Sequence, residues 1–203
     1  FTITPTANFN GNVSLNYDVS DGQLTTAASL SYTVDAVNDA PVAGSISASL
    51  SNGVEDTTYT VSAAQLLQGF TDIEGDSLSV TNLSSSNGSI TDNLDGTFTI
   101  TPTPNFNGSV TLHYDVSDGQ LSTVASLSYT VDAVNDAPEV LVPVADQQVD
   151  ESQIFTYTLP TDAFIDIDTA VLSYSATLAS GADLPSWLSF DAATQTFSGT
   201  PSY

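Results

Sequence analysis

The sequence predicts an all-β protein built from tandem Greek-key β-sandwich domains that follow one another end to end. Apolar residues make up 40% of the 203 positions and alternate with Ser and Thr, which is the pattern of strands with one buried face. The strand-like segments are short and separated by polar turns, and no long helical pattern interrupts them. A long segment recurs after 97 residues, a period typical of a sandwich domain and too long for a solenoid unit.

This repeat sets the expected domain organisation. Residues 1–41 recur as residues 98–138 and differ at six positions. Each copy ends in Asn-Asp-Ala-Pro, where Pro41 or Pro138 ends one strand and allows another to begin. We therefore expect three parts: the C-terminal part of one repeat (1–40), a complete repeat (41–137) and a domain of different sequence that lacks its last strands (138–203).

The complete repeat contains six strand-like segments in order. They are Tyr59–Ser62, Leu78–Leu83, Gly88–Asp92, Thr97–Thr101, Val110–Ser117 and Ala125–Val134. Asp95-Gly96 lies between two of them and predicts a two-residue hairpin turn. Leu66–Phe70 is expected to form a short helical turn.

Two interpretations of the partial domains remain open. In one, the chain is an excerpt of a much longer protein. In the other, a second copy of the chain completes the partial ends strand by strand, which would make the chain a subunit of an extracellular filament.

The charge of the chain excludes several function classes. It has 24 Asp and Glu, no Lys or Arg, and a net charge of −24. Nucleic acids and anionic membrane surfaces are excluded as partners, because both bind through Lys and Arg. No apolar run approaches the roughly 18 residues that a membrane span requires. One His and no Cys or Lys leave only paired carboxylates for catalysis, so we do not expect an enzyme.

The acidic residues gather in loops at repeated positions. The clusters contain Asp35, Asn38 and Asp39; Asp132, Asn135 and Asp136; Asp72, Glu74 and Asp76; Asp166 and Asp168; Glu55 and Asp56; and Asp150 and Glu151. Two carboxylates about 4 Å apart repel by roughly 4 kcal/mol at an effective dielectric constant near 20. Because no encoded cation can balance them, the sequence predicts a bound metal ion. Hard oxygen ligands without Cys favour Ca²⁺ or Mg²⁺.

The same motifs resemble a known family. Val-Asp-Ala-Val-Asn-Asp-Ala-Pro at the junctions, Phe70–Asp76 and Asn105–Gly108 are similar to the cadherin-like tandem repeats of large secreted (RTX-type) bacterial surface adhesins. This resemblance covers residues 1–138. Residues 139–203 resemble the dystroglycan-type cadherin-like domain, also described as an immunoglobulin domain, in the motifs Leu184–Asp191 and Thr196–Pro201.

The resemblance implies Ca²⁺ ions held between successive domains. At the first junction the implied ligands are Asp35, Asn38, Asp39, Asp72, Glu74 and Asp118. At the second junction they are Glu55, Asp132, Asn135, Asp136, Asp166 and Asp168. The Asp-Arg-Glu ligand motif of animal cadherins is missing, since the chain has no Arg, so we expect one or two ions at each junction rather than three.

The resemblance also implies a function. We expect a structural or adhesive segment of a bacterial cell-surface or secreted extracellular protein, stiffened by Ca²⁺. Its partners would be the neighbouring domains of the same long chain. Two alternatives remain open: a carbohydrate-binding module that takes surface polysaccharide, and the filament subunit assembled from copies of the chain.

Overall fold

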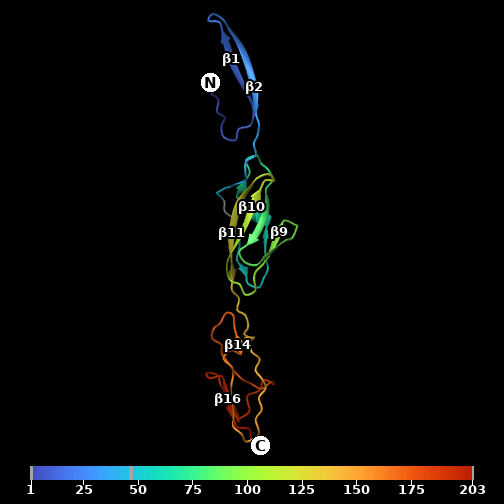
Figure 1. Ribbon diagram of the computed structural model, residues 1–203, viewed down its shortest axis with the longest axis vertical. Coiled ribbons are helices and arrows are strands. Elements are labelled where there is room, and N and C mark those ends of the chain that lie inside the picture. Colours follow the sequence, from blue (N-terminus) through green and yellow to red (C-terminus); the bar gives the residue numbers. More distant parts are fainter. Residues whose placement is uncertain (1, 46–47, 203) are drawn as a thin grey trace. The chain divides into compact units, whose positions relative to one another are not determined.

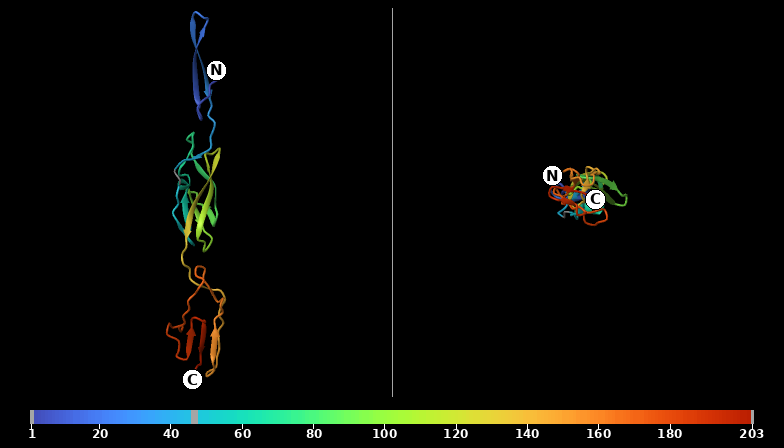
Figure 2. Two further views of the ribbon diagram at one scale, coloured as in Figure 1. Left: turned by 90° about the vertical axis from the view of Figure 1, so that its left-hand side faces the viewer. Right: turned by 90° about the horizontal axis from the view of Figure 1, so that it is seen from below.

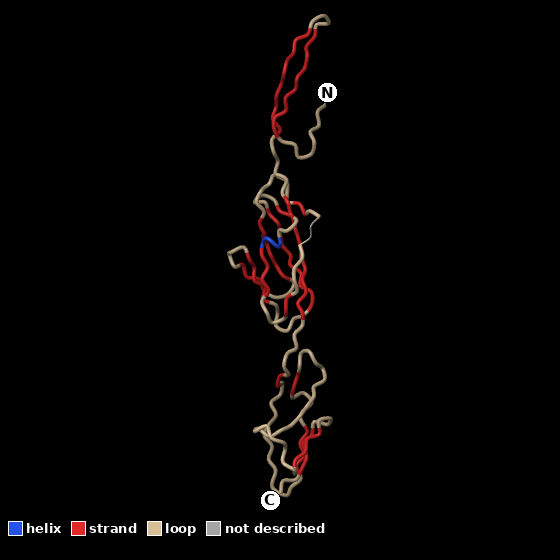
Figure 3. The backbone as a smooth tube through the Cα atoms, turned by 180° about the vertical axis from the view of Figure 1, so that it is seen from behind, coloured by secondary structure: helices blue, strands red, loops and turns tan. Residues whose placement is uncertain are grey.

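The computed structural model describes residues 2–45 and 48–202, which form two compact units, residues 1–133 and residues 134–203. Strands dominate, and the only helix over the described residues is the short α1 (Ala63–Leu66) (Figure 3). The predicted all-β fold class is confirmed. No described helix is both long enough and apolar enough to cross a membrane.

The first unit begins with a hairpin of β1 (Gly11–Ser20) and β2 (Thr25–Val34), paired in register over all 10 residues of each strand. These strands form a sheet of their own, drawn in blue in Figure 1. Directly opposed residues share a face of a sheet. One face, which we call the apolar face, therefore carries residues 11, 13, 15, 17 and 19 of β1 and residues 26, 28, 30, 32 and 34 of β2.

The central domain follows, in residues 41–132. Its strands are β3 (Val42–Ala43), β4 (Gly53–Val54), β5 (Tyr59–Ser62), β6 (Phe70–Thr71), β7 (Ser79–Ser85), β8 (Ser89–Asp92), β9 (Thr97–Thr101), β10 (Gly108–Ser117) and β11 (Ser122–Asp132). They form sheets in the orders β4-β11-β10-β7, β5-β9-β8 and β3-β6. β10 and β11 make a long hairpin that repeats the sequence of β1 and β2 (Figure 2).

The core of the first unit lies within the central domain. The β10–β11 hairpin contributes Val110, Leu112, Tyr114, Val116, Tyr129 and Val131, each at most 4% exposed. Val61 of β5, Ile100 of β9 and Leu66 of α1 pack against them and are fully buried. The second sheet and the helix thus cover the face of β10–β11 that corresponds to the apolar face of β1–β2.

Local capping decides where α1 begins. The Ser62 side chain accepts a hydrogen bond from the Gln65 backbone N–H, and the Gln65 side chain accepts one from the Ser62 N–H, which is a capping box. The helical turn therefore starts at Ala63, three residues before the predicted Leu66–Phe70. Tyr114 fixes the far end, since its hydroxyl donates to the Leu66 carbonyl at 2.9 Å.

All six predicted strands of the central domain are present, but the predicted two-residue turn at Asp95-Gly96 is wrong. β8 ends at Asp92 and β9 begins at Thr97, so the loop is longer. The Asp92 carboxylate accepts a hydrogen bond from the Leu94 N–H at 2.8 Å, and the Asp95 carboxylate accepts one from the Thr97 N–H at 3.0 Å. These local bonds favour the wider loop.

The second unit contains shorter strands. They are β12 (Glu139–Val140), β13 (Phe155–Thr158), β14 (Phe164–Ile165), β15 (Leu188–Asp191) and β16 (Thr196–Gly199). β12 pairs with β14, and the other three form a sheet in the order β13-β16-β15. Aromatic contacts support both sheets, with ring centroids 6.0 Å apart for Phe164 and Tyr174 and 4.5 Å apart for Phe190 and Phe197.

The two hairpins give a matched test of where the core lies. We expect Leu112→Ala to lower the free energy of unfolding of the first unit by about 2–5 kcal/mol, because Leu112 is fully buried. Leu15→Ala, the same change in β1, should cost much less, because no second sheet formed by residues 2–45 and 48–202 covers Leu15. Urea unfolding followed by far-UV circular dichroism measures both, and equal losses would contradict this assignment of the core.

Candidate metal centre

Asn38 attaches the linker between the β1–β2 hairpin and the central domain to the β10–β11 loop. Its Nδ2 donates to Asp118 Oδ2 at 2.8 Å and to the Asp39 carbonyl at 3.1 Å. Its Oδ1 accepts from Gln120 Nε2 at 3.2 Å. The linker is therefore held by side chains from a strand connection that lies 80 residues further along the chain.

The β10–β11 loop keeps the Asp118 carboxylate charged. Its Oδ1 accepts hydrogen bonds from the backbone N–H groups of Leu121 at 2.7 Å and Gln120 at 2.6 Å. These donors, and after them the Asn38 amide, lower the pKa of Asp118 below its ordinary value of 3.8. Backbone donors likewise lower the pKa of Asp21, the equivalent residue of the first hairpin. The hairpin loop thus favours the charged carboxylate of both Asp21 and Asp118. The linker adds a further hydrogen-bond donor, Asn38, to Asp118.

A second group of acids meets the linker from the segment after β6. The Asp39 N–H donates to Glu74 Oε2 at 3.1 Å. Asp72 Oδ1 accepts from the N–H groups of Glu74 at 3.0 Å and Asp76 at 3.1 Å, which shapes the acidic loop. The other oxygen, Asp72 Oδ2, is buried and has no hydrogen-bond partner. A buried carboxylate oxygen without a donor is costly unless something else compensates its charge.

A hollow of about 260 Å³ lies beside these acids. Its lining residues are Asn8, Phe9, Asn10, Val34, Asp35, Ala36, Val37, Asp39 and Glu74. Three acidic residues, Asp35, Asp39 and Glu74, therefore line it together with Asn8 and Asn10. No Lys or Arg exists anywhere in the chain to balance the three charges.

Hydrogen bonds connect five of the six ligands predicted at the first junction. Asn38 contacts both Asp118 and Asp39, and the bonds continue from Asp39 to Glu74 and Asp72. Asp35 lines the hollow together with Asp39 and Glu74. Within residues 2–45 and 48–202, no three acidic, His or Cys side chains converge closely enough to hold a metal ion. An ion would therefore need amide or carbonyl oxygens in addition to carboxylates, a mixture that Ca²⁺ accepts.

The second unit repeats the linker pattern. Asn135 Nδ2 donates to the Asp136 carbonyl at 2.6 Å, and the Asp136 N–H donates to Asp168 Oδ2 at 2.7 Å. The Asp168 N–H in turn donates to Asp166 Oδ1 at 3.0 Å. Asp166 and Asp168 thus take the parts of Asp72 and Glu74, although the two loops differ in sequence.

The two remaining predicted ligands belong to the first unit and have Asn partners that sequence reasoning missed. Asn52 Nδ2 donates to both carboxylate oxygens of Asp132, at 3.0 and 3.1 Å. Glu55 is 3% exposed, its N–H donates to the Asp132 carbonyl at 3.0 Å, and its Oε2 accepts from Asn107 Nδ2 at 3.2 Å. The repeated Asn-Phe-Asn-Gly motif, at residues 8–11 and 105–108, was a signal for Asn107.

The sequence matches two protein families, which are those its motifs resemble. Residues 1–35 and 37–132 match the family described as "Cadherin-like domain", and residues 137–203 match the family described as "Putative Ig domain". No curated protein matches the sequence.

Two solved structures show a distant likeness. The endo-fucoidan hydrolase MfFcnA4 from glycoside hydrolase family 107 is 22% identical over 98% of this chain, with a TM-score of 0.39, and the chain spans 31% of that structure. The mouse clustered PcdhgC3 EC1-3 structure is 12% identical over 95% of this chain, with a TM-score of 0.39, and 66% of that structure is covered. At these TM-scores neither structure bears on what this chain does.

The linker contact can be tested through the pKa of Asp118. We expect Asn38→Ala to raise this pKa and to leave the pKa of Asp21 unchanged, since Asn38 donates to Asp118 alone of the two. Because the folded pKa lies below the unfolded value, the stabilisation is complete above about pH 4 and is lost as the pH falls through the folded pKa. NMR titration of the side-chain carboxyl groups measures both residues. An Asp118 pKa that does not respond to Asn38→Ala would show that the linker is not held there.

Proposed function

The chain belongs to the family of cadherin-like domains, and on this premise we propose that it is a structural or adhesive segment of a secreted bacterial surface protein in which Ca²⁺ fixes the linker of residues 35–40. Cadherin-like and Ig-like domains are extracellular domains with adhesive or structural roles, and they are typically not enzymes. The calcium, the secretion and the bacterial surface are the parts that this proposal adds.

The unpartnered oxygen of Asp72 carries the proposal. Asp118 accepts hydrogen bonds at both carboxylate oxygens, and Asp35, Asp39 and Glu74 line the hollow, whereas Asp72 Oδ2 is buried with no hydrogen-bond donor. A hard divalent cation is the natural partner of such an oxygen in a chain without Lys or Arg. The side chains nearby offer oxygen atoms as metal ligands, and the chain has no Cys. Such ligands fit Ca²⁺ better than zinc or copper.

The residues that would hold the ion are Asp35, Asn38, Asp39, Asp72, Glu74 and Asp118. When bound, Ca²⁺ supplies positive charge that offsets the repulsion among these acids. The chain's own hydrogen bonds already bring linker, acidic loop and β10–β11 loop together. Neutralising the charge of the acids would remove the repulsion among them, so the linker would be held rigidly against the two loops.

The same donor pattern in the second unit extends the proposal. Asn135, Asp136, Asp166 and Asp168 repeat the bonds made by Asn38, Asp39, Asp72 and Glu74. The two linkers are followed by acidic loops of different sequence, yet both make the same pattern of hydrogen bonds. We take this recurrence as support for a common ligand class, a divalent cation bound through oxygen.

Calcium should raise the thermal stability of the full chain. Extracellular modules bind Ca²⁺ with dissociation constants of about 10⁻⁴–10⁻³ M. At 10 mM Ca²⁺ a site of about 0.1 mM contributes roughly 2.7 kcal/mol to the free energy of unfolding. Thermal unfolding with Ca²⁺, with Mg²⁺ and with excess chelator measures the effect, and small-angle scattering under the same conditions measures the loss of linker freedom.

Two variants and one control locate the effect. Asp72→Asn and Glu74→Gln keep the size of the side chain and one of its two oxygens but remove one charge each, so both should lose most of the calcium-dependent rise in Tm. Asp18→Asn removes an exposed carboxylate from the face of β1 opposite the apolar face, and it should leave the calcium-dependent rise in Tm intact. A melting temperature and a scattering profile that ignore calcium, or an equal loss in all three variants, would overturn the proposal.

A further inference from the structure

The side-chain amide of Asn38 has hydrogen-bond partners at both its nitrogen and its oxygen. Nδ2 donates to Asp118 Oδ2 at 2.8 Å and to the Asp39 carbonyl at 3.1 Å, and Oδ1 accepts from Gln120 Nε2 at 3.2 Å. A carboxylate accepts hydrogen bonds and cannot donate them, so the nitrogen of the amide must face Asp118. The oxygen of the amide therefore faces Gln120.

Asp118 is satisfied by neutral donors in this arrangement. Its Oδ1 accepts from the backbone N–H groups of Gln120 and Leu121, and its Oδ2 accepts from Asn38. Asn38 and Asp118 are both half-buried. The two side chains are thus partners of each other in the chain without an ion.

This orientation competes with a role for Asn38 as a metal ligand. Asn binds Ca²⁺ through its side-chain oxygen and not through its NH₂ group. That oxygen is held by Gln120, while the NH₂ group occupies the side that faces Asp118. Asn38 can therefore offer Oδ1 to a cation beside Asp118 only after it gives up the bond from Gln120 and the bond to Asp118.

We propose that Gln120 is a positioning residue that holds the Asn38 amide in this orientation and thereby weakens the calcium affinity of the linker site. The inference rests on the proposed function, since it takes Asn38 and Asp118 as two of the ligands. Gln120 acts through Asn38 and not by contact with the ion. The same hydrogen bonds keep the linker attached to the β10–β11 loop when calcium is withdrawn.

The linker of the second unit has the same Asn without this restraint. Asn135 Nδ2 donates to the Asp136 carbonyl at 2.6 Å, as Asn38 Nδ2 does to the Asp39 carbonyl. Over the described ranges, 2–45 and 48–202, no side chain donates a hydrogen bond to Asn135 Oδ1. The restraint thus distinguishes the first linker from the second.

The first hairpin supplies a matched glutamine for a control. Residues 21–24 repeat the sequence of residues 118–121, and the Asp21 carboxylate likewise accepts from two backbone N–H groups of its loop, at 2.7 and 2.8 Å. In the part of the chain that the structure describes, the Gln23 side chain makes no hydrogen bond. A substitution of Gln23 therefore repeats the local change at Gln120 without touching a linker.

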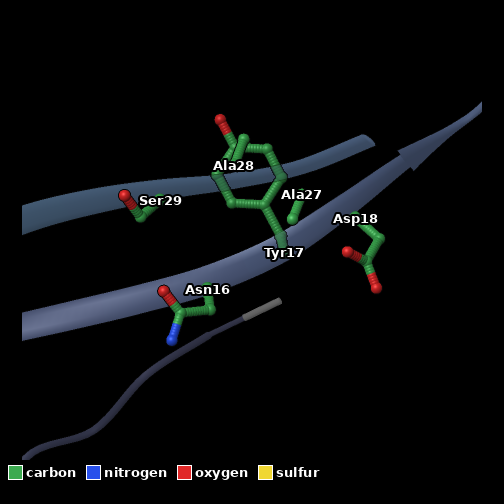
Figure 4. A pocket seen from close by; sticks show the side chains of 6 residues that line it. All are labelled: Asn16, Tyr17, Asp18, Ala27, Ala28 and Ser29. Atoms are coloured by element: carbon green, nitrogen blue, oxygen red, sulfur yellow. The ribbon is translucent and has the colours of Figure 1, made fainter. Parts of the chain in front are cut away.

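Calcium binding at the strands of this hairpin should not disturb that control. A hollow of about 350 Å³ lies on the strands (Figure 4), and Asp18 is the only acid among its described lining residues. Ca²⁺ takes about six to eight oxygen ligands, of which one carboxylate supplies at most two. The hollow is therefore a poor calcium site.

Calcium titration of the full chain with Gln120→Met tests the proposal. Methionine has nearly the length of glutamine but cannot donate to Asn38, so Oδ1 of Asn38 becomes available to the ion. We expect the dissociation constant for calcium to fall by about 2- to 10-fold, which corresponds to one neutral hydrogen bond. Gln23→Met should leave the constant unchanged. The backbone amide signals of Gly119 and Leu121, followed by NMR, report this linker separately from that of the second unit.

A second measurement needs no calcium. The side-chain NH₂ of Asn38 should exchange its hydrogens with water more slowly than that of Asn135, because the Asn38 amide is held at both its nitrogen and its oxygen. Gln120→Met should speed the exchange at Asn38 and leave Asn135 unchanged. A merely structural role for Gln120 would lower the unfolding temperature without strengthening calcium binding.

Three results would overturn the proposal. A dissociation constant that Gln120→Met leaves unchanged or raises, while Asp72→Asn weakens binding, would show that Gln120 does not restrain a working site. Exchange at Asn38 that Gln120→Met does not speed would show that Gln120 does not hold the amide. An unsubstituted chain that binds no calcium would overturn the proposed function and this inference with it.

Discussion

No carboxylate of this chain can pair with a Lys or Arg side chain, because the sequence has 24 acids and neither cation. Neutral donors take that part instead. In the first unit, Asn amides donate over long sequence separations in four pairs: Asn38 to Asp118, Asn52 to Asp132, Asn82 to Asp115 and Asn107 to Glu55. Hydrogen bonds to a charged group are short and strong, but a neutral donor leaves the negative charge in place. The bonds therefore set positions without removing repulsion.

This constraint is most severe at the linkers, where acids from separate segments meet. Backbone N–H groups orient Glu74 and Asp72, and the Asn38 amide orients Asp118. Each bond fixes one oxygen and leaves the total charge unchanged. Stability at these points then depends on ions in the surroundings, because the chain contributes geometry and the solvent contributes the countercharge.

The sequence predicted this arrangement only in part. Alternating apolar residues identified the six strands of the central domain, since a buried face leaves a period of two. The resemblance to cadherin-like repeats placed Asp39 near Glu74, because it assigned both residues to one junction. The partners Asn52 and Asn107 were missed, since amide donors leave no periodic signal and only the folded chain shows which acid each one faces. Loop lengths such as that after Asp92 depend on local carboxylate bonds that composition does not reveal.

Burial was the property least accessible from sequence, and the two hairpins show why. Tyr17 and Tyr114 stand in identical strand contexts, yet one is largely exposed and the other buried. Whether an apolar face is covered depends on what packs against it and not on the strand itself. Contiguous exposed apolar residues are uncommon on soluble surfaces unless they serve contact. On β1–β2 the face that meets solvent has kept every residue of the covered copy, while all the strand substitutions fall on the opposite face. A face adapted to water would have no reason to keep Tyr17, Val19 and Tyr32, so its sequence is better explained by a cover of the shape that β5, β9 and α1 provide.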